Sequence, residues 1–267
     1  MTELTLALWQ GEGIPGDLPA TVGAVSGIAR EAARRDADLL VFAEGYLTGY
    51  HLPDLAPGDL AGVEDALAEI GRIAAQTGLT IVMGTHLDTS QGLRNAAVAV
   101  SDTGVELGRY HKRALYGAWE KATFVPGDTP LRFACGDFRV GVAICYDVEF
   151  PEIIRAEALA GVDLVVVPTA LMAPHTRVAR QLVAVRAMEN QIFLGYCNRT
   201  GLETGRYGPL EFVGLSSIRG PEGETLAEAG TEAELLLATL DRARQTAARD
   251  AFCYIGDLAG LRQTLTC

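Results

Sequence analysis

Short apolar runs and amphipathic segments alternate along most of the chain. The apolar runs are typical of strands covered on both faces, and apolar residues at helical spacing, such as Val22, Val25 and Ile28, indicate helices. Strands are predicted at Leu4–Trp9, Asp38–Ala43, Leu79–Leu87, Asn95–Ser101, Val105–His111, Leu131–Cys135, Phe138–Ile144, Asp163–Pro168, Ile192–Asn198, Phe212–Arg219 and Glu234–Leu240. Helices are predicted at Ala20–Arg35, Leu60–Gln76, Pro151–Ala160, Thr176–Glu189 and Asp241–Arg249.

These elements interleave without a linker-like change of composition. Gly45–Asp59 is predicted to be a loop, and Ala114–Asp128 a long connection. No internal repeat is visible. The pattern predicts one α/β domain over residues 1–267, whose last residues, about 250–267, form a C-terminal tail.

Net charge, the length of apolar runs and the spacing of cysteines exclude several classes of function for this protein. The net charge is −12 and no basic run occurs, which argues against nucleic acid or an anionic membrane as a partner. No apolar run reaches the roughly 18 residues of a membrane span, and the N-terminus lacks the pattern of a signal peptide. The five cysteines are scattered, with no CxxC pair, and no HExxH motif occurs. We therefore expect a reducing, cytoplasmic location without disulfides or a metal site.

Three chemically useful residues follow predicted strands. Glu44 follows one buried strand, Lys112 ends near another, and Cys145 lies where a third strand stops. Active sites of α/β sheets lie beyond the carboxyl ends of strands. Together the three would make an acyl-transfer site, in which a cysteine attacks a carbonyl, a glutamate moves protons and a lysine stabilises the oxyanion. Taken singly, each also has an ordinary structural explanation, as a buried thiol, a solvated carboxylate or a surface lysine.

The cysteine also precedes a predicted helix that begins at Pro151. A thiol near a helix N-terminus feels positive potential. We therefore expect Cys145 to favour the thiolate.

Three longer segments resemble the signature motifs of the nitrilase superfamily of carbon–nitrogen hydrolases, in the family's order. They are Phe42–Tyr50 around the glutamate, Tyr110–Gly117 around the lysine and Cys145–Glu152 around the cysteine. Glu120 resembles the family's second glutamate. Ala43 stands where the family commonly has proline, which affects a backbone restraint rather than the chemistry. Weaker matches are found at Val167–Ala170, Arg186–Gln191, Asn198–Gly201 and Gly214–Ile218.

The resemblance implies a four-layer α-β-β-α sandwich, usually a homodimer or higher homo-oligomer, with no cofactor and no metal. It implies catalytic roles for Glu44, Lys112, Cys145 and Glu120. Cys-Tyr-Asp followed by Phe-Pro-Glu is similar to the amidase side of the family, so we expect a small-molecule amide substrate. Residues expected to bind the substrate are Tyr146, Tyr50, Trp119, Ala170 and His175.

Other functions stay open at this point. Hydrolysis of an N-carbamoyl compound would need a basic group for the substrate carboxylate, and His175, Arg177 and Arg180 are candidates. Hydrolysis of a nitrile could use the same catalytic residues. The segment Gly11–Gly16 fits the GxGxxG pattern of NAD-binding proteins, although Pro15 removes a backbone donor from it. A non-catalytic binding module on the same fold is a further alternative, and so is a Cys–His hydrolase with His51, His86, His111 or His175 as its base.

Overall fold

Two six-stranded sheets form the centre of the protein. The computed structural model describes residues 2–52, 54–205 and 208–261. The first sheet has the order β14-β1-β2-β3-β4-β5, and the second β13-β12-β9-β8-β7-β6. In the first sheet the strands are β1 (Glu3–Gln10), β2 (Leu39–Phe42), β3 (Thr80–Thr89), β4 (Gly92–Val100), β5 (Glu106–His111) and β14 (Glu234–Asp241). In the second they are β6 (Arg132–Cys135), β7 (Phe138–Val142), β8 (Leu164–Pro168), β9 (Phe193–Cys197), β12 (Ser217–Arg219) and β13 (Thr225–Glu228).

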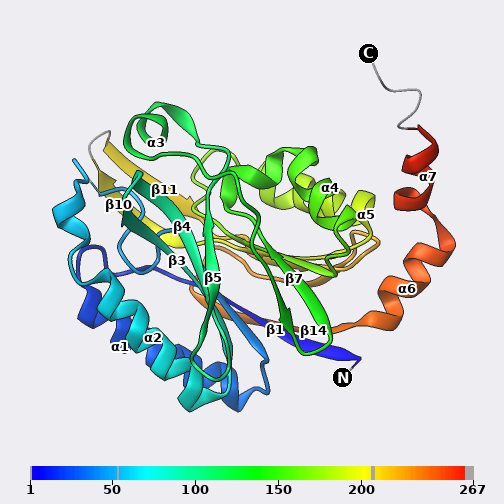
Figure 1. Cartoon of the computed structure of the whole chain (residues 1–267), viewed down its shortest axis with the longest axis horizontal. Coiled ribbons are helices and arrows are strands. Elements are labelled where there is room, and N and C mark those ends of the chain that lie inside the picture. The colour runs from blue at the N-terminus through cyan, green and yellow to red at the C-terminus, as the bar shows by residue number, and fades with distance from the viewer. Residues whose placement is uncertain (1, 53, 206–207, 262–267) are drawn as a thin grey trace.

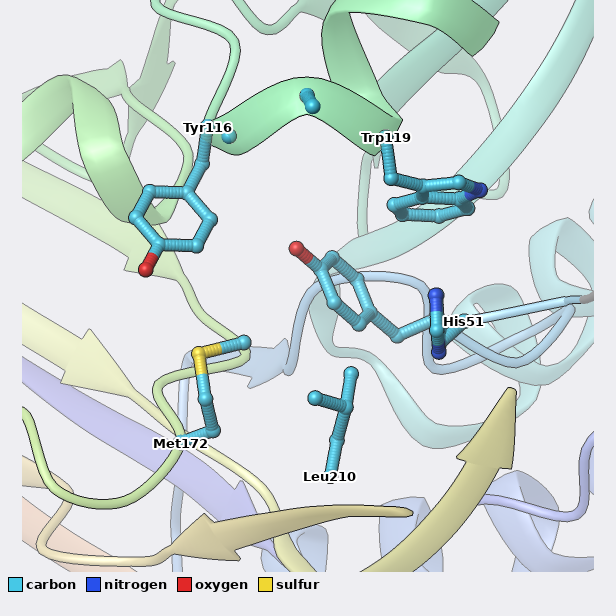
Figure 2. Close-up of a pocket in the computed structure, with 8 residues that line it drawn as sticks. His51, Tyr116, Trp119, Met172 and Leu210 are labelled. Carbon is cyan, nitrogen blue, oxygen red and sulfur yellow. The ribbon is translucent and has the colours of Figure 1, made fainter. Parts of the chain in front are cut away.

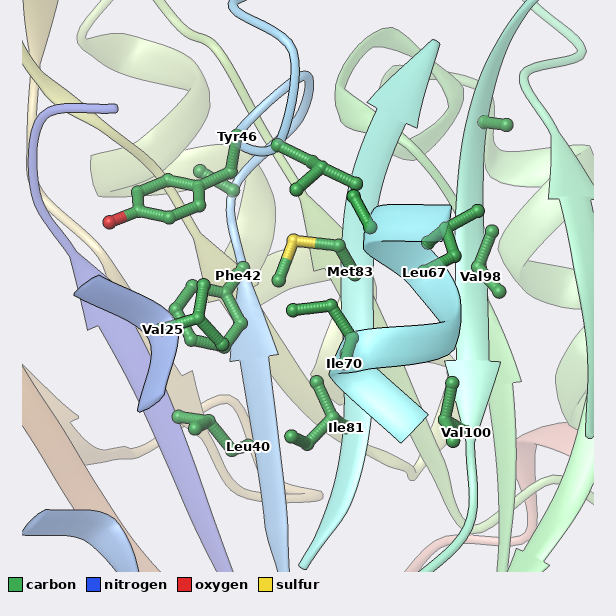
Figure 3. Close-up of a cluster of buried hydrophobic side chains, with 14 of the residues drawn as sticks. Val25, Leu40, Phe42, Tyr46, Leu67, Ile70, Ile81, Met83, Val98 and Val100 are labelled. Atoms are coloured by element: carbon green, nitrogen blue, oxygen red, sulfur yellow. The ribbon is translucent and has the colours of Figure 1, made fainter. Parts of the chain in front are cut away.

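Helices cover the outer face of each sheet, so the molecule has four layers (Figure 1). The helices are α1 (Leu18–Arg34), α2 (Val63–Thr77), α3 (Gly117–Thr123), α4 (Pro151–Leu159), α5 (Val183–Asn190), α6 (Arg242–Ala251) and α7 (Tyr254–Leu261). The α1–α2 pair packs on the first sheet, where Val25 and Ile70 lie over Phe42 and Met83 (Figure 3). The α4–α5 pair packs on the second sheet through a separate core. Along the described segments, no helix has the length and apolar character needed to cross a membrane.

The two sheets bury a third core between them, with Leu6 and Val41 on one side and Val140 and Val166 on the other. These side chains are fully buried. Each contributes about 1.5–3 kcal/mol to the hydrophobic free energy of folding. Strands β1, β2 and β3 run parallel, as do β7, β8 and β9. The carboxyl ends of neighbouring parallel strands therefore meet at common edges, where loops can come together.

The predicted fold is confirmed, and the differences are local. The predicted long connection contains α3, and β10 (Thr200–Gly205) and β13 were not predicted. The predicted strand Phe212–Arg219 is broken into β11 (Gly208–Val213) and β12, because Gly214 and Leu215 take left-handed φ values of 63° and 61°. Strands β10 and β11 form a hairpin outside both sheets. Of the predicted tail, Tyr254–Leu261 forms α7, and residues 262–267 lie outside the described residues.

Candidate active site

Close backbone approaches bring the strand-end loops together. The loop after β2 carries Glu44 and passes directly over Gly84 of β3, where a Cβ atom would lie 2.0 Å from the Ala43 carbonyl oxygen. The loop after β5 carries Lys112 and is crossed by Gly127, whose N–H donates to the Lys112 carbonyl at 2.8 Å. A side chain at either glycine would collide with backbone, which explains why the smallest residue occupies both positions.

A buried ion triad forms where these loops meet. Lys112 Nζ lies 2.7 Å from Glu44 Oε1 and 2.7 Å from Glu120 Oε1, and all three side chains are fully buried. Glu120 comes from α3, and its Oε2 accepts the Tyr116 N–H at 2.6 Å. Because buried charges are stable only when they are paired and hydrogen-bonded, the three side chains hold one another in place.

Two neutral side chains complete the network. Asn95 of β4 donates from Nδ2 to Glu44 Oε1 at 2.7 Å, and the Tyr50 hydroxyl donates to Glu120 Oε1 at 2.8 Å. One oxygen of Glu44 is thus doubly engaged, whereas its buried Oε2 has no hydrogen-bond partner among the described residues. That oxygen is available to accept a proton from another group.

Burial shapes the proton affinities of the triad. It raises the pKa of Glu44, as does the charge of Glu120, whereas Lys112 opposes the rise. Burial alone would lower the pKa of Lys112, but the two carboxylates outweigh it and raise that pKa above its ordinary value. The lysine therefore stays an ammonium, and Glu44 becomes a stronger base than an ordinary glutamate.

Cys145 occupies a left-handed backbone conformation, with φ of 45°, at the start of a 3₁₀ turn spanning Cys145–Glu149. Such values are uncommon outside glycine and cluster at functional sites. The helix α4 begins at Pro151, as predicted, but the expectation that Cys145 favours the thiolate is wrong, because the thiol is buried beside Glu44. Burial and the charge of Glu44 raise the pKa of the Cys145 thiol well above its usual range, although Lys112 and the Ala170 N–H oppose the rise. The resting thiol is protonated and needs a base.

Asp147 joins the cysteine turn to the lysine loop. Its Oδ2 accepts from the Ile144 N–H and the Tyr110 hydroxyl, both at 2.9 Å. Its Oδ1 accepts from the Ala114 N–H at 2.7 Å and from Arg113 N–H at 3.2 Å. One buried carboxylate thus fixes the distance between two strand-end loops.

A second buried pair supports the glutamate loop from the β10–β11 hairpin. Arg199 donates to Glu203 and also from Nη1 to the Glu44 carbonyl at 3.3 Å. Glu203 Oε2 accepts the N–H groups of Tyr50 and His51, each at 3.1 Å. This pair therefore holds the backbone at the catalytic candidate Glu44 and at Tyr50, which is predicted to bind the substrate.

The Cys145 side chain opens onto a cavity of about 240 Å³. Four of the five residues predicted to bind substrate line it, namely Tyr50, Tyr146, Ala170 and His175. Trp119 lines an adjoining apolar cavity instead, which shares Tyr50 with the first. Figure 2 shows Tyr116 and Trp119 facing Met172 and Leu210 across this second space.

Sequence reasoning missed several residues of the site. They are Asn95, Asp147, Arg199, Glu203, Tyr116, Glu149, Met172 and Val178. Two had a local signal: Asn95 is the polar residue of an otherwise apolar run, and Asp147 lies two positions after the cysteine. Tyr116, Glu149 and Arg199 lie inside the segments that resemble the family, but nothing there singled them out. Glu203, Met172 and Val178 are found only through contacts between distant segments.

The glycine-rich segment near the N-terminus has a structural role. Gly13 lies against Arg199, and a Cβ atom there would be 3.0 Å from Nη2. The Asp17 carboxylate caps α1 through the Ala20 N–H at 2.9 Å, so a side chain already fills the position that a pyrophosphate would need. Within residues 2–52, 54–205 and 208–261, no three His, Cys, Asp or Glu side chains are grouped so that they could hold a metal ion.

Comparisons with known proteins identify the family of this chain. Residues 5–250 match the carbon–nitrogen hydrolase family. An (R)-stereoselective amidase from a Pseudomonas species is 35% identical over 83% of this chain and 80% of its own, and a nitrilase from Pyrococcus abyssi is 34% identical over 80% of each. The amidase from Nesterenkonia sp. AN1 in complex with butyramide superposes with a TM-score of 0.85 at 32% identity, covering 98% of this chain and 97% of the other. Another structure of that enzyme shows covalent addition of the acetamide moiety of fluoroacetamide at its active-site cysteine.

With a match over almost its whole length, the chain belongs to the carbon–nitrogen hydrolase family. Its fold is that of the nitrilase-superfamily amidases. The predicted family, fold and amidase class of enzyme are thereby confirmed.

Proposed function

We propose that the protein hydrolyses small amides to a carboxylate and ammonia through a thioester on Cys145. The observation that carries the proposal is the buried Glu44–Lys112–Glu120 triad, which leaves Glu44 Oε2 unpaired in the same site as a protonated thiol. Amide ligands of the Nesterenkonia amidase support this substrate class.

The first half of the reaction forms the thioester. Glu44 takes the Cys145 proton while the sulfur attacks the amide carbon. The Lys112 ammonium, which has a third N–H besides the two given to carboxylates, and the Tyr146 N–H stabilise the oxyanion. Glu44 then gives its proton to the leaving nitrogen, and ammonia departs.

The second half regenerates the enzyme. Glu44 takes a proton from water, the hydroxide attacks the thioester, and the carboxylate product leaves as the Cys145 thiol regains its proton. Glu120 does not move protons in this scheme. It holds Lys112 and, through Tyr50, one wall of the cavity.

The test is ammonia release from a panel of simple amides, N-carbamoyl amino acids and nitriles. We expect release from amides by the wild-type protein and none by Cys145→Ala. Cys197→Ala is the matched control, since that thiol is buried between the sheets with acceptors at Trp9 O and Val41 O. A fully active Cys145→Ala protein would refute the assignment, and loss of activity in both variants would point to misfolding.

The residues that line the Cys145 cavity favour a simple amide over an N-carbamoyl compound as the substrate. Two of the three candidate partners for a substrate carboxylate, Arg177 and Arg180, are exposed and do not line it, whereas the third, His175, does. We also propose a cytoplasmic location, which the free thiols Cys135, Cys145, Cys197 and Cys253 support.

The homodimer implied by the family resemblance stays a proposal, and equilibrium sedimentation tests it.

A further inference from the structure

One charged side chain in the wall of the Cys145 cavity has no role in the proposed chemistry. Glu149, at the end of the 3₁₀ turn that begins with the nucleophile, is half-buried and lines the cavity together with Tyr116, Tyr146 and His175. Within the described part of the chain, its carboxylate makes no hydrogen bond or ion pair. A partly desolvated carboxylate without a partner is costly, and a ligand that supplies one gains the difference.

The cations around Glu149 are engaged elsewhere. The Arg186 guanidinium donates to the carbonyl oxygens of Val148 and Glu149, each at 2.9 Å, and to Glu189 at 2.9 Å. Lys112 is held by its two glutamates. Arg186 thereby fixes the backbone that carries Glu149 without neutralising its carboxylate. Among the residues that the structure describes, no lysine or arginine lines the cavity.

Aromatic rings adjoin the carboxylate. The rings of Tyr116 and Tyr146 stand 5.3 Å apart at 74°, and both line the same cavity. The ring of Tyr146 also meets that of Phe150, the neighbour of Glu149, at 5.0 Å. Aromatic faces attract cations, so rings beside a carboxylate form a suitable environment for an ammonium group.

Resting on the amidase function above, we propose that Glu149 makes this cavity selective for amides whose acyl group carries a protonated amine. The amide carbon lies at Cys145 and the amine extends along the cavity to Glu149. A substrate with a carboxylate in that place meets like charge and binds poorly. Burial raises the pKa of Glu149 and the charges of His175 and Lys112 oppose this, so a bound cation would further favour the ionised carboxylate.

His175 is the side chain among the described lining residues that can carry a positive charge. Its Nε2 lies 3.5 Å from the Tyr116 hydroxyl, and no ion pair with Glu149 is formed. An imidazolium here would weaken the preference for cations.

The test compares amides of matched length that differ in terminal charge. The neutral ones are butanamide and pentanamide, the cationic ones 3-aminopropanamide and 4-aminobutanamide, and the anionic one 4-carbamoylbutanoate. Wild-type kcat/KM should be about tenfold higher for the better cationic amide than for its neutral counterpart, and lowest for the anionic amide. Tenfold corresponds to a charge-assisted hydrogen bond of about 1.4 kcal/mol.

Variants assign the selectivity to one residue. Glu149→Gln should reduce the cationic-to-neutral ratio to about one, and Glu149→Lys should make the anionic amide the better substrate. Glu152→Gln is the matched control, because it removes the same charge three positions away, on an exposed residue outside the cavity. It should keep the wild-type ratio.

The outcomes separate the two proposals. A wild-type protein that hydrolyses neutral amides without preferring cationic ones overturns the role of Glu149, as does a ratio that survives in Glu149→Gln. The wild-type ratio is measurable even if a variant fails to fold. Absence of ammonia from every amide, with Cys145→Ala and wild type alike, overturns the amidase function itself.

Discussion

The Arg199–Glu203 pair offers the sharpest test of how the site is held. In Glu203→Gln the side chain keeps its shape and loses its charge. Arg199, which is only 1% exposed, then lacks its ion-pair partner. Its remaining neighbours are the Glu44 carbonyl oxygen at 3.3 Å and the ring of Phe212 at 4.9 Å. Burial already lowers the pKa of Arg199, and Glu203 is the main group opposing that shift.

Breaking one side of a buried ion pair costs about 3–5 kcal/mol. The amide oxygen of glutamine can still accept from the Tyr50 and His51 N–H groups, so we expect a loss near the lower end, about 3 kcal/mol. Against a typical total stability of about 5–15 kcal/mol, that loss is large. Because Tyr50 reaches Glu120 through its hydroxyl, kcat should fall as well.

Urea unfolding, followed by circular dichroism, measures the change. Glu211→Gln is the matched control, since it removes an exposed carboxylate from the same hairpin and should cost less than about 0.5 kcal/mol. The double variant Arg199→Met, Glu203→Gln has no unpaired charge and should be more stable than Glu203→Gln alone. A loss below about 1 kcal/mol in Glu203→Gln, or strictly additive losses in the double variant, would refute the reasoning.

Two further changes test the catalytic network, and a third tests how stability depends on pH. Lys112→Met should abolish turnover, because the oxyanion loses the ammonium group that stabilises it and Glu44 and Glu120 are left as unpaired buried carboxylates. Near-normal ammonia release by this variant would show that the oxyanion role of Lys112 is wrong. Asp147→Asn places an NH₂ group against backbone donors and should lower the free energy of unfolding by about 2–3 kcal/mol. We also expect a marked fall in kcat, and an unchanged kcat would exclude a positioning role for Asp147. Burial lowers the pKa of His86 to about 3, so the folded state resists protonation that the unfolded state accepts below about pH 6.5. Stability is therefore lost as pH falls, by about 2 kcal/mol between pH 7 and pH 5, and His86→Gln should flatten that part of the stability–pH curve.

The pattern of the sequence determined the α/β class and the residues that carry the chemistry, and the resemblance to the family implied the four layers. Apolar runs predicted the buried strands. The position of the active site was predicted by the reactive residues at the ends of these strands, namely Glu44, Lys112 and Cys145. These signals are local: they need only the period of a strand and the residue at its end. The motif around each residue then named the family, which the comparisons confirm.

The tertiary structure decided what surrounds those residues. Asn95 reaches Glu44 across 51 positions of sequence, and Glu203 reaches the Tyr50 N–H across 153. No local pattern encodes such contacts, because they join separate elements: Asn95 lies in β4, whereas Glu44 follows β2, and Glu203 lies in β10, outside both six-stranded sheets. The proton affinity of Cys145 also depends on tertiary structure. The sequence shows that this cysteine precedes a helix, but burial beside Glu44 raises the pKa of its thiol. Local periodicity therefore fixes the elements, while desolvation and long-range pairing fix what the site can do.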